Sequence, residues 1–520
     1  MKRLFGFSTV LCTTVAAVWF FGGVAALATG LPQTGQTECF DEFGAPVDCA
    51  TGANPGQDGF YQAGTCSASR FFEPNPPDGT VTDACTGLMW VKSPDTTGDG
   101  IADSADRMLF CDALTYCENL NFATHSDWRL PNVFELESIV DYGSVGPAID
   151  TLFFDVDIEG GGASQHLYWS SSRLHTRNTV AAVHFSAGAV SRQNVSPTDN
   201  PVPFNVRAVR SLPAGAGAGG GAVAQGEGEG GGGFAGNGDV NGDGEFDLSD
   251  AIYTLAHLFQ GGPAPVACPE APGGGGCVET NCNNNVDDDE DGSTDCADFD
   301  CIVDANCLTG DLPKTGRTAC WNDRSIPAGE AEAILCADTG ICPGQDGFYQ
   351  LGCGGAGRFV PDPGNTGTDA DGMPVDDTVL DTCTGLEWTR ALVDVTGDGT
   401  LDASDAGGTW AQALAACEAL VFADKSDWRL PNVREMLSIS TFEPFGNDPF
   451  GGSTLEAIFD NPEIGVENWH WTSTTTAATN RAIVYSMASS RNAGISETAS
   501  KQTGVGVPVF RAVRGGQTNN

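Results

Sequence analysis

The stretch SDWRLPNV at residues 126–133 returns letter for letter at residues 426–433. In each copy the asparagine is followed three residues later by a glutamate, Glu135 or Glu435, which is the spacing of a capping box. The proline suits the entry to a helix, because its φ is fixed and its missing N–H needs no partner there. We therefore predict that the octet forms the corner at which a helix begins, and that the chain is a tandem repeat.

Other motifs recur in the same order around both octets. Before each octet, apolar residues at helical spacing predict a helix, and the remaining motifs, GQDGFYQ included, predict short strands with glycine turns. Strands, two helices and further strands in each copy predict an α+β fold. The repeated motifs are LPQTG and LPKTG at Leu31 and Leu312, GQDGFYQ at Gly56 and Gly344, CTGLMW and CTGLEW ending at Trp90 and Trp388, YWSSS and HWTST at Tyr168 and His470, and RAVR ending at Arg210 and Arg514.

The composition divides the chain into seven segments. Lys2 and Arg3, an apolar run and small residues resemble a secretory signal peptide, so we expect an exported protein. We expect no transmembrane segment after signal removal, because no later stretch is long and apolar enough. The predicted segments are a signal peptide (1–28), copy 1 (29–212), a Gly/Ala-rich linker (213–236), a calcium loop and helix (237–265), a Cys/Asp-rich calcium-loop segment (266–308), copy 2 (309–515) and a tail (516–520).

Cysteine usage supports export. The sequence has 19 cysteines; Cys12 lies in the predicted signal peptide, and the others fall into three blocks of six. Even numbers without Cys-x-x-Cys pairs favour disulfides over zinc, and we predict three self-contained sets. The first pairings that we predict are Cys39–Cys49, Cys320–Cys336, Cys85–Cys117 and Cys383–Cys417.

Acidic residues dominate the charge and recur at one spacing. With 69 Asp and Glu against 24 Lys and Arg, the net charge of −45 excludes nucleic acid as a partner and attracts divalent cations. Four segments share D-x-[DNT]-x-D-G-x-x-D-x-x-D, the oxygen and glycine pattern of an EF-hand-like loop with Asp at position 12. A solvated acidic loop is the alternative for any single segment. We predict structural calcium at Asp95, Thr97, Asp99, Asp103 and Asp106; Asp239, Asn241, Asp243, Asp247 and Asp250; Asp287, Asp289, Asp291, Asp295 and Asp298; and Asp394, Thr396, Asp398, Asp402 and Asp405.

The ordered motifs of both copies resemble a known family. A strand ending in TGLxW, a helix with one cysteine, SDWRLPNxxEL, a YWSSS-like strand and a closing RAVR are similar to the C-terminal domain of the bacterial collagen-like adhesin Lcl. The resemblance implies two C-type-lectin-like or formylglycine-generating-enzyme-like α+β domains, used outside the cell or at the bacterial cell surface. It also implies binding of glycans. The acidic charge argues for neutral sugars, or for anionic ones bound through calcium.

Between the copies, residues 238–259 resemble one calcium-loop-and-helix half of a dockerin. A complete dockerin has two such halves, and a Cys-rich segment stands in the second place. Binding of a cohesin-like protein is one hypothesis for this region. A rigid spacer that holds two lectin-like heads apart is the other.

An enzyme is the remaining alternative, because WRLP before a helix also occurs in formylglycine-generating enzymes. Those enzymes use two copper-binding cysteines late in the domain, and neither copy has a cysteine after its octet. The motifs GxSxG and HExxH are also missing from the sequence. We therefore predict a protein without enzymatic activity.

Arginines and tryptophans that recur in both copies are the candidate ligand residues. The guanidinium groups suit a carboxylate or sulfate, and the indoles suit a sugar face. The structural alternative is that the arginines pair with Asp127 or Asp427 and that the tryptophans are core. The candidates are Arg129, Arg207, Arg210, Trp169, Arg429, Arg511, Arg514 and Trp471.

Together these patterns predict a secreted or cell-surface binding and adhesion protein. We expect it to recognise an extracellular polysaccharide or glycan, with calcium in a structural role. Two heads on a tether would raise avidity for a repeating polymer. The alternatives are a scaffold component that binds a protein partner through the dockerin-like spacer, and a catalyst related to the formylglycine-generating enzymes.

Overall fold

The computed structural model describes residues 31–212 and 312–515. The predicted signal peptide, linker, dockerin-like segment and Cys/Asp-rich segment lie outside the described residues, as does the acidic loop 394–405. The further gaps within the two ranges are 53, 65–69, 75, 145, 158–165, 175–178, 187, 196–201, 319, 322–332, 335, 337–341, 355–357, 363–377, 394–407, 424, 443–457, 460–468, 477–479, 488–494 and 503–507.

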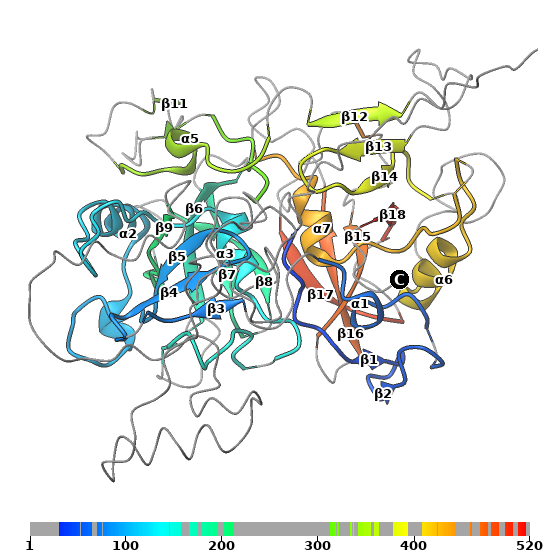
Figure 1. Ribbon diagram of the computed structural model, residues 1–520, viewed down its shortest axis with the longest axis horizontal. Coiled ribbons are helices and arrows are strands. Elements are labelled where there is room, and N and C mark those ends of the chain that lie inside the picture. Colours follow the sequence, from blue (N-terminus) through cyan, green and yellow to red (C-terminus); the bar gives the residue numbers. More distant parts are fainter. Residues whose placement is uncertain are drawn as a thin grey trace, which may run out of the picture.

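Both copies combine short helices with antiparallel strands (Figure 1). Copy 1 contains β1 (Cys39–Phe40), β2 (Pro46–Val47), α1 (Asp58–Tyr61), β3 (Phe71–Phe72), β4 (Thr80–Asp83), β5 (Leu88–Val91), the 3-10 turn Ser104–Asp106, α2 (Phe110–Glu118), α3 (Val133–Ser138), β6 (Leu167–Arg173), β7 (Thr179–His184), β8 (Ala189–Asn194) and β9 (Val209–Ser211). Copy 2 contains β10 (Cys320–Trp321), β11 (Ala333–Ile334), α5 (Asp346–Tyr349), β12 (Phe359–Asp362), β13 (Thr378–Asp381), β14 (Glu387–Thr389), α6 (Trp410–Glu418), α7 (Val433–Ser438), β15 (Trp469–Thr475), β16 (Arg481–Ser486), β17 (Ser496–Ser500) and β18 (Val513–Arg514).

Each copy has one four-stranded and one three-stranded sheet. The orders are β3-β4-β5-β9 and β6-β7-β8 in copy 1, and β12-β13-β14-β18 and β15-β16-β17 in copy 2. The RAVR motif supplies β9 and β18, which pair with β5 and β14 and so join the end of each copy to its beginning. Mixed helices and antiparallel sheets confirm the predicted α+β class.

The octet forms the predicted helix-entry corner. The Asn132 side chain accepts a hydrogen bond from the Glu135 N–H at 2.9 Å, and the Glu135 carboxylate accepts one from the Asn132 N–H at 2.8 Å. Asn432 and Glu435 repeat both bonds at α7. This reciprocal cap satisfies two N–H groups that the first turn of a helix leaves without partners.

The prediction of a strand at GQDGFYQ was wrong. Residues 58–61 and 346–349 each form a single helical turn, and the glutamine that ends it takes a left-handed conformation, with φ of 45° at Gln62 and 48° at Gln350. A buried, hydrogen-bonded aspartate, and not an alternation of apolar and polar residues, determines the structure of this motif. Asp58 is 2% exposed and accepts hydrogen bonds from two hydroxyls, which fixes the turn.

Two of the predicted disulfides are confirmed and two are wrong. Cys39–Cys49 and Cys320–Cys336 are formed. Cys383 is bonded to Cys353, Cys85 is disulfide-bonded, and Cys117 and Cys417 are free and buried within α2 and α6. The prediction of self-contained sets was also wrong, because Cys111 of copy 1 is bonded to Cys342 of copy 2.

The N-terminal part of each copy packs on the other copy. We call residues 31–63 arm 1 and residues 312–353 arm 2, and the rest of each copy its body. Figure 1 shows α1 and β1 beside α6 and the β15-β16-β17 sheet, whereas α5 lies beside copy 1. The Tyr61 hydroxyl donates to Glu418 at 2.8 Å, and the Tyr349 hydroxyl donates to Glu118 at 2.6 Å.

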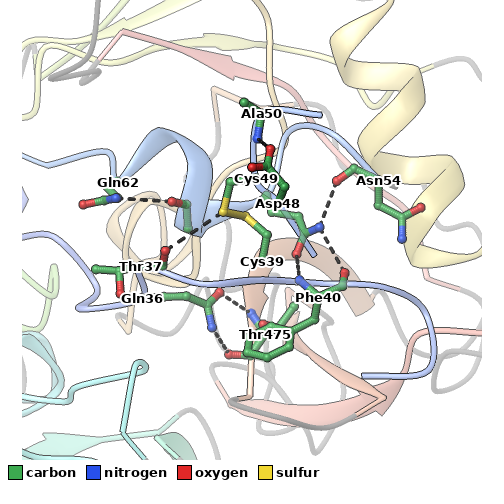
Figure 2. The surroundings of a disulfide bond; sticks show 12 residues. Gln36, Thr37, Cys39, Phe40, Asp48, Cys49, Ala50, Asn54, Gln62 and Thr475 are labelled. Atoms are coloured by element: carbon green, nitrogen blue, oxygen red, sulfur yellow. Dashed lines mark hydrogen bonds between the residues drawn. A yellow bond between two sulfur atoms is a disulfide. The ribbon is translucent and has the colours of Figure 1, made fainter. Parts of the chain in front are cut away.

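Arm 1 is held on copy 2 through main-chain and side-chain bonds (Figure 2). The Gln36 amide donates to the Thr475 carbonyl at 2.8 Å and accepts from the Thr475 N–H at 3.0 Å, so that it extends the edge of β15. Gln57 makes the same two bonds to the main chain of Phe40. The Cys39–Cys49 disulfide then closes the arm into a compact unit.

The two copies therefore pack directly against each other, which contradicts the hypothesis that the two heads are held apart; the spacer segment itself lies outside the described residues. The helices α3 and α7 contact each other, and the Phe134 and Phe442 rings meet edge to face at 5.8 Å. The Val190 N–H in β8 donates to the Ser496 hydroxyl in β17 at 2.8 Å. Exchange of the arms makes one interlocked structure from two repeats.

Loss of the inter-copy disulfide is expected to destabilise the whole chain. Cys111 and Cys342 are 231 positions apart, so the bond restricts the unfolded chain strongly. We expect Cys342→Ser to lower the free energy of unfolding by about 3–5 kcal/mol, measured by denaturant titration. A non-reducing peptide map of the wild type should join copy 1 to copy 2 at these residues. A bond from Cys111 to a cysteine of its own copy would contradict the exchange.

The buried Asp58 should make folding pH-dependent. Burial raises the pKa of Asp58 to about 6 from 3.8, although the hydrogen bonds from Thr474 and Thr34 oppose the shift. A raised folded pKa stabilises the protein below the unfolded pKa, and this stabilisation is lost as the pH rises through about 6. Relative to Asp58→Asn, the wild type should lose roughly 2–3 kcal/mol between pH 4 and pH 7 in denaturant titrations. The exposed Asp112→Asn is the control and should leave the difference near zero.

Candidate functional site

The octet arginines are internal. Arg129 donates to both carboxylate oxygens of Glu135 at 2.7 Å, and its guanidinium lies 5.7 Å from the centre of the Tyr349 ring in arm 2. In copy 2, Arg429 pairs with Glu435 in the same way and lies over Tyr61 of arm 1. The expected partner Asp127 is not the partner of Arg129. Each of these two-bond Arg–Glu pairs, which we call a fork, instead joins the helix cap to the exchanged arm.

The arginines of the closing motif divide into a pair that bonds backbone carbonyls and a pair that bonds carboxylates. Arg207 donates to the carbonyls of Val91 and Asp155, and Arg511 donates to the carbonyl of Thr389. Arg210 holds Asp127 through bonds of 2.7 and 3.1 Å, which confirms the predicted structural pairing. These bonds lower the pKa of Asp127.

Arg514 repeats the pairing with an aspartate in copy 2. It bonds Asp427 at 2.7 and 2.9 Å and Glu387 at 2.6 Å, and its side chain is 29% exposed. This makes it the most accessible of the predicted arginines. The carboxylates beside it occupy its guanidinium and would repel an anionic sugar.

The two predicted tryptophans are core residues. Trp169 and Trp471 are 1% and 0% exposed. Their indole N–H groups donate to the carbonyls of Met108 at 2.8 Å and Gly408 at 3.0 Å. The structure thus gives all eight predicted ligand residues protein partners, and their ligand role stays a prediction.

The acidic loop 95–106 is the one predicted calcium loop within the described residues. Asp95 accepts from the Gly100 N–H at 2.7 Å, and Gly100 has a φ of 86°, which suits the glycine of a sharp turn. Asp106 is 1% exposed and accepts from the N–H groups of Thr96 and Thr97 at 2.8 and 2.9 Å. Burial raises the pKa of Asp106, but the backbone hydrogen bonds from Asp103, Thr97 and Thr96 outweigh burial and lower it.

The side chains of this loop are chemically suited to calcium, but the structure does not gather them into a group that could bind the ion. Its side chains offer oxygen only, which is what a hard cation prefers. Asp103 spends a carboxylate oxygen on the Ala105 N–H at 2.7 Å, as the cap of the 3-10 turn. Among the described residues, no three His, Cys, Asp or Glu side chains gather into a group that could hold a metal.

A pocket lies where arm 1 leaves the body of copy 1. Its volume is about 300 Å³, which is at the lower end for small-molecule sites. Carboxylates, amides and hydroxyls line it together with a short apolar wall. The residues used below are Gln33, Gln62, Phe71, Val140, Asp141 and Asp150.

The polar groups of the pocket are positioned by local turns. Asp141 accepts from the Gly143 N–H at 2.9 Å and from the Ser144 hydroxyl at 2.6 Å, and Asp150 accepts from the Leu152 N–H at 2.9 Å. Each carboxylate keeps further lone pairs for a ligand hydroxyl. Arg70, which also lines the pocket, is tied to Asp83 and lies over the Phe71 ring.

This pocket was not predicted from the sequence. Gln33 and Gln62 belong to shared motifs that predict turns and strands, and Asp141 and Asp150 belong to none, so the repeat did not point to a pocket. Two of the pocket positions are instead marked by a difference in residue type between the copies. By the alignment of the two octets, Asp141 corresponds to Thr441, and by that of the two opening pentapeptides, Gln33 corresponds to Lys314.

The fold and these sites define a class of protein: a disulfide-linked tandem α+β module with an acidic surface. The family model for the Lcl C-terminal domain matches residues 79–210 and again residues 377–510. The chain belongs to this family, in two copies, and the family points to a surface or adhesin-like protein. Both matches begin after the exchanged arms.

Further comparisons add no relative. Neither the curated proteins nor the solved structures contain a match to the chain. Within the part of the chain that the structure describes, every helix is too short or too polar to cross a bilayer.

The Arg129–Glu135 fork predicts a loss of stability on mutation. Arg129→Met leaves the Glu135 carboxylate buried without its cation, and we expect a loss of about 3–5 kcal/mol of unfolding free energy. The control Arg514→Gln breaks a partly exposed pair and should cost about 1 kcal/mol or less. Denaturant titration measures both. Equal losses in the two variants would contradict a structural role that is specific to the octet.

Proposed function

We propose that the protein is an extracellular adhesin-like protein that binds glycans by non-catalytic recognition. The observation that carries this proposal is the pocket between arm 1 and the body of copy 1. A sugar presents hydroxyl groups that donate and accept, and the carboxylates of Asp141 and Asp150 and the amides of Gln33 and Gln62 are suited to both. Phe71 and Val140 supply an apolar wall for the C–H groups of the ring.

The charge of the pocket selects among glycans. Asp141 and Asp150 are acidic, and Arg70 is already paired with Asp83. The whole chain carries a net charge of −45, which opposes a sulfated or carboxylated polymer. The preferred ligand is therefore a neutral sugar.

Calcium belongs to this proposal as a structural ion in the four acidic loops. What supports it is the fourfold recurrence of an oxygen-only pattern with glycine at position 6. The ion would neutralise clustered carboxylates and thereby stabilise the loops. A C-type-lectin-like fold for each copy, an exported chain and a dockerin-like insert that binds a cohesin-like partner belong to the same proposal.

A glycan array tests the function directly. We expect the oxidised full chain to bind neutral glycans, and Asp141→Thr, which installs the residue of copy 2, to weaken binding at least tenfold, because a charge-assisted hydrogen bond contributes about 1.5–3 kcal/mol. The control Asp112→Asn makes the same charge change on the exposed face of α2 and should leave binding unchanged. A folded chain that binds no glycan would favour a protein partner instead.

Removal of calcium tests the structural ion separately. We expect millimolar calcium to raise the melting temperature relative to chelator, since a ligand that binds only the folded state stabilises it. Asp99→Asn should reduce the calcium-dependent shift, because Asp99 spends only one oxygen, on the Ile101 N–H. Identical melting curves in calcium and chelator would refute the calcium proposal and leave glycan binding to the array.

A further inference from the structure

The contact between the copies contains pairs of residues that break the repeat. The octets align position 134 with 434 and position 137 with 437. Position 134 is phenylalanine in copy 1 but arginine in copy 2, and position 137 is glutamate in copy 1 but leucine in copy 2. All four side chains are buried where α3 meets α7.

Arg434 and Glu137 form a buried ion pair across this contact. The Arg434 Nε donates to the Glu137 carboxylate at 3.3 Å, and Nη2 donates to the Val140 carbonyl at 2.5 Å. The Nη1 group reaches the carbonyls of Pro32 and Gln33 in arm 1. The side chains of Arg434 and Glu137 are 2% and 3% exposed. Arg434 thus ties α7 to copy 1 and to the point at which arm 1 departs.

The inter-copy disulfide breaks the repeat in a second place. Cys342 precedes the α5 turn, and its equivalent in arm 1 is Asn54. The equivalent of Cys111 in copy 2 is Ala411. Two matching junctions exist between arms and bodies, and the Cys111–Cys342 bond closes only one of them.

We propose that the contact is selective: the surface of copy 1 formed by α3 and the Cys111 end of α2 accepts copy 2 as its partner and rejects a second copy of itself. Two copies of the first repeat would bury two Glu137 carboxylates against Phe134, without a cation, and would place Cys111 opposite Asn54. Two copies of the second repeat would bury Arg434 against Leu437 and leave Cys342 without its thiol partner. A buried charge that loses its partner is strongly destabilising.

Selectivity has a structural consequence. Arms that exchange within one chain can in principle exchange between chains, which leads to open-ended assemblies of tandem repeats. A contact that accepts only unlike copies, inside one molecule that contains both, favours closure of each chain on itself. The chain then presents its two bodies in one fixed relation.

A disulfide reporter in the full chain tests the proposal. The reporter carries Asn54→Cys and Cys342→Asn, so that both reactive cysteines, the one introduced at position 54 and Cys111, belong to copy 1. They face each other only when copy 1 pairs with copy 1 of another chain, or when arm 1 folds back on its own body. We expect the reporter to refold as a monomer, with no disulfide-linked dimer on a non-reducing gel.

Removal of the ion pair should reverse this result. Adding Glu137→Leu and Arg434→Phe makes both copies alike at these positions, and we expect at least a tenfold increase in the linked dimer after refolding at equal concentration. A second version with Glu137→Gln and Arg434→Met keeps the side-chain sizes closer and should give the same increase if the first one folds poorly. Near-ultraviolet circular dichroism checks that each chain is folded.

A control variant tests whether the junction between arm 1 and copy 2 can form a disulfide. Asn54→Cys with Ala411→Cys should form a second bond within one chain, which shows that this junction accepts a disulfide. An equal amount of linked dimer with and without the ion pair would overturn the proposal. So would no linked dimer in either folded variant, or a bond between position 54 and Cys111 within one chain.

Discussion

The fork between the octet arginine and its capping glutamate links a helix cap, a buried ion pair and the exchanged arm. In copy 2 the Glu435 carboxylate accepts the Asn432 N–H, which starts α7, and also binds Arg429. The guanidinium then lies over Tyr61 of arm 1, whose hydroxyl bonds Glu418 at the end of α6. A local helix cap, a buried ion pair and the seat of the exchanged arm thus share one carboxylate. Loss of the cation leaves all three without support.

What could be predicted from the sequence is what depends on neighbours in the chain. The capping box at Asn132, the helix around Cys117 and the closing strand at Arg210 follow from local spacing, and the structure confirms them. The arm exchange could not be predicted in this way. The Asp58 turn meets Thr474, and the equivalent Asp346 turn meets Ser172, so either body offers a hydroxyl to either arm.

Disulfide pairing failed for a related reason. Repetition suggested that equivalent cysteines pair within each copy, and this holds for the hairpin bond at Cys39. The positions equivalent to Cys111 and Cys342 hold Ala411 and Asn54, so these two cysteines have no cysteine counterpart in the repeat, and they form the bond between the copies. The pocket was not predicted for the same reason, because Asp141 also has no equivalent aspartate in copy 2. In a tandem repeat, shared residues specify the fold, and differing residues specify what each copy does.

Exchange also changes how two repeats contribute to recognition. Two heads on a flexible tether gain avidity from linker length, whereas interlocked bodies gain it only for ligands whose spacing matches their own. The pocket lies between arm 1 and the body of copy 1, at the point where arm 1 crosses at Thr34 toward copy 2 and Asp58 accepts the Thr34 and Thr474 hydroxyls together. The surface available to a ligand is therefore a product of the pairing of the copies. A substitution that loosens the contact between copies would alter the pocket without touching it.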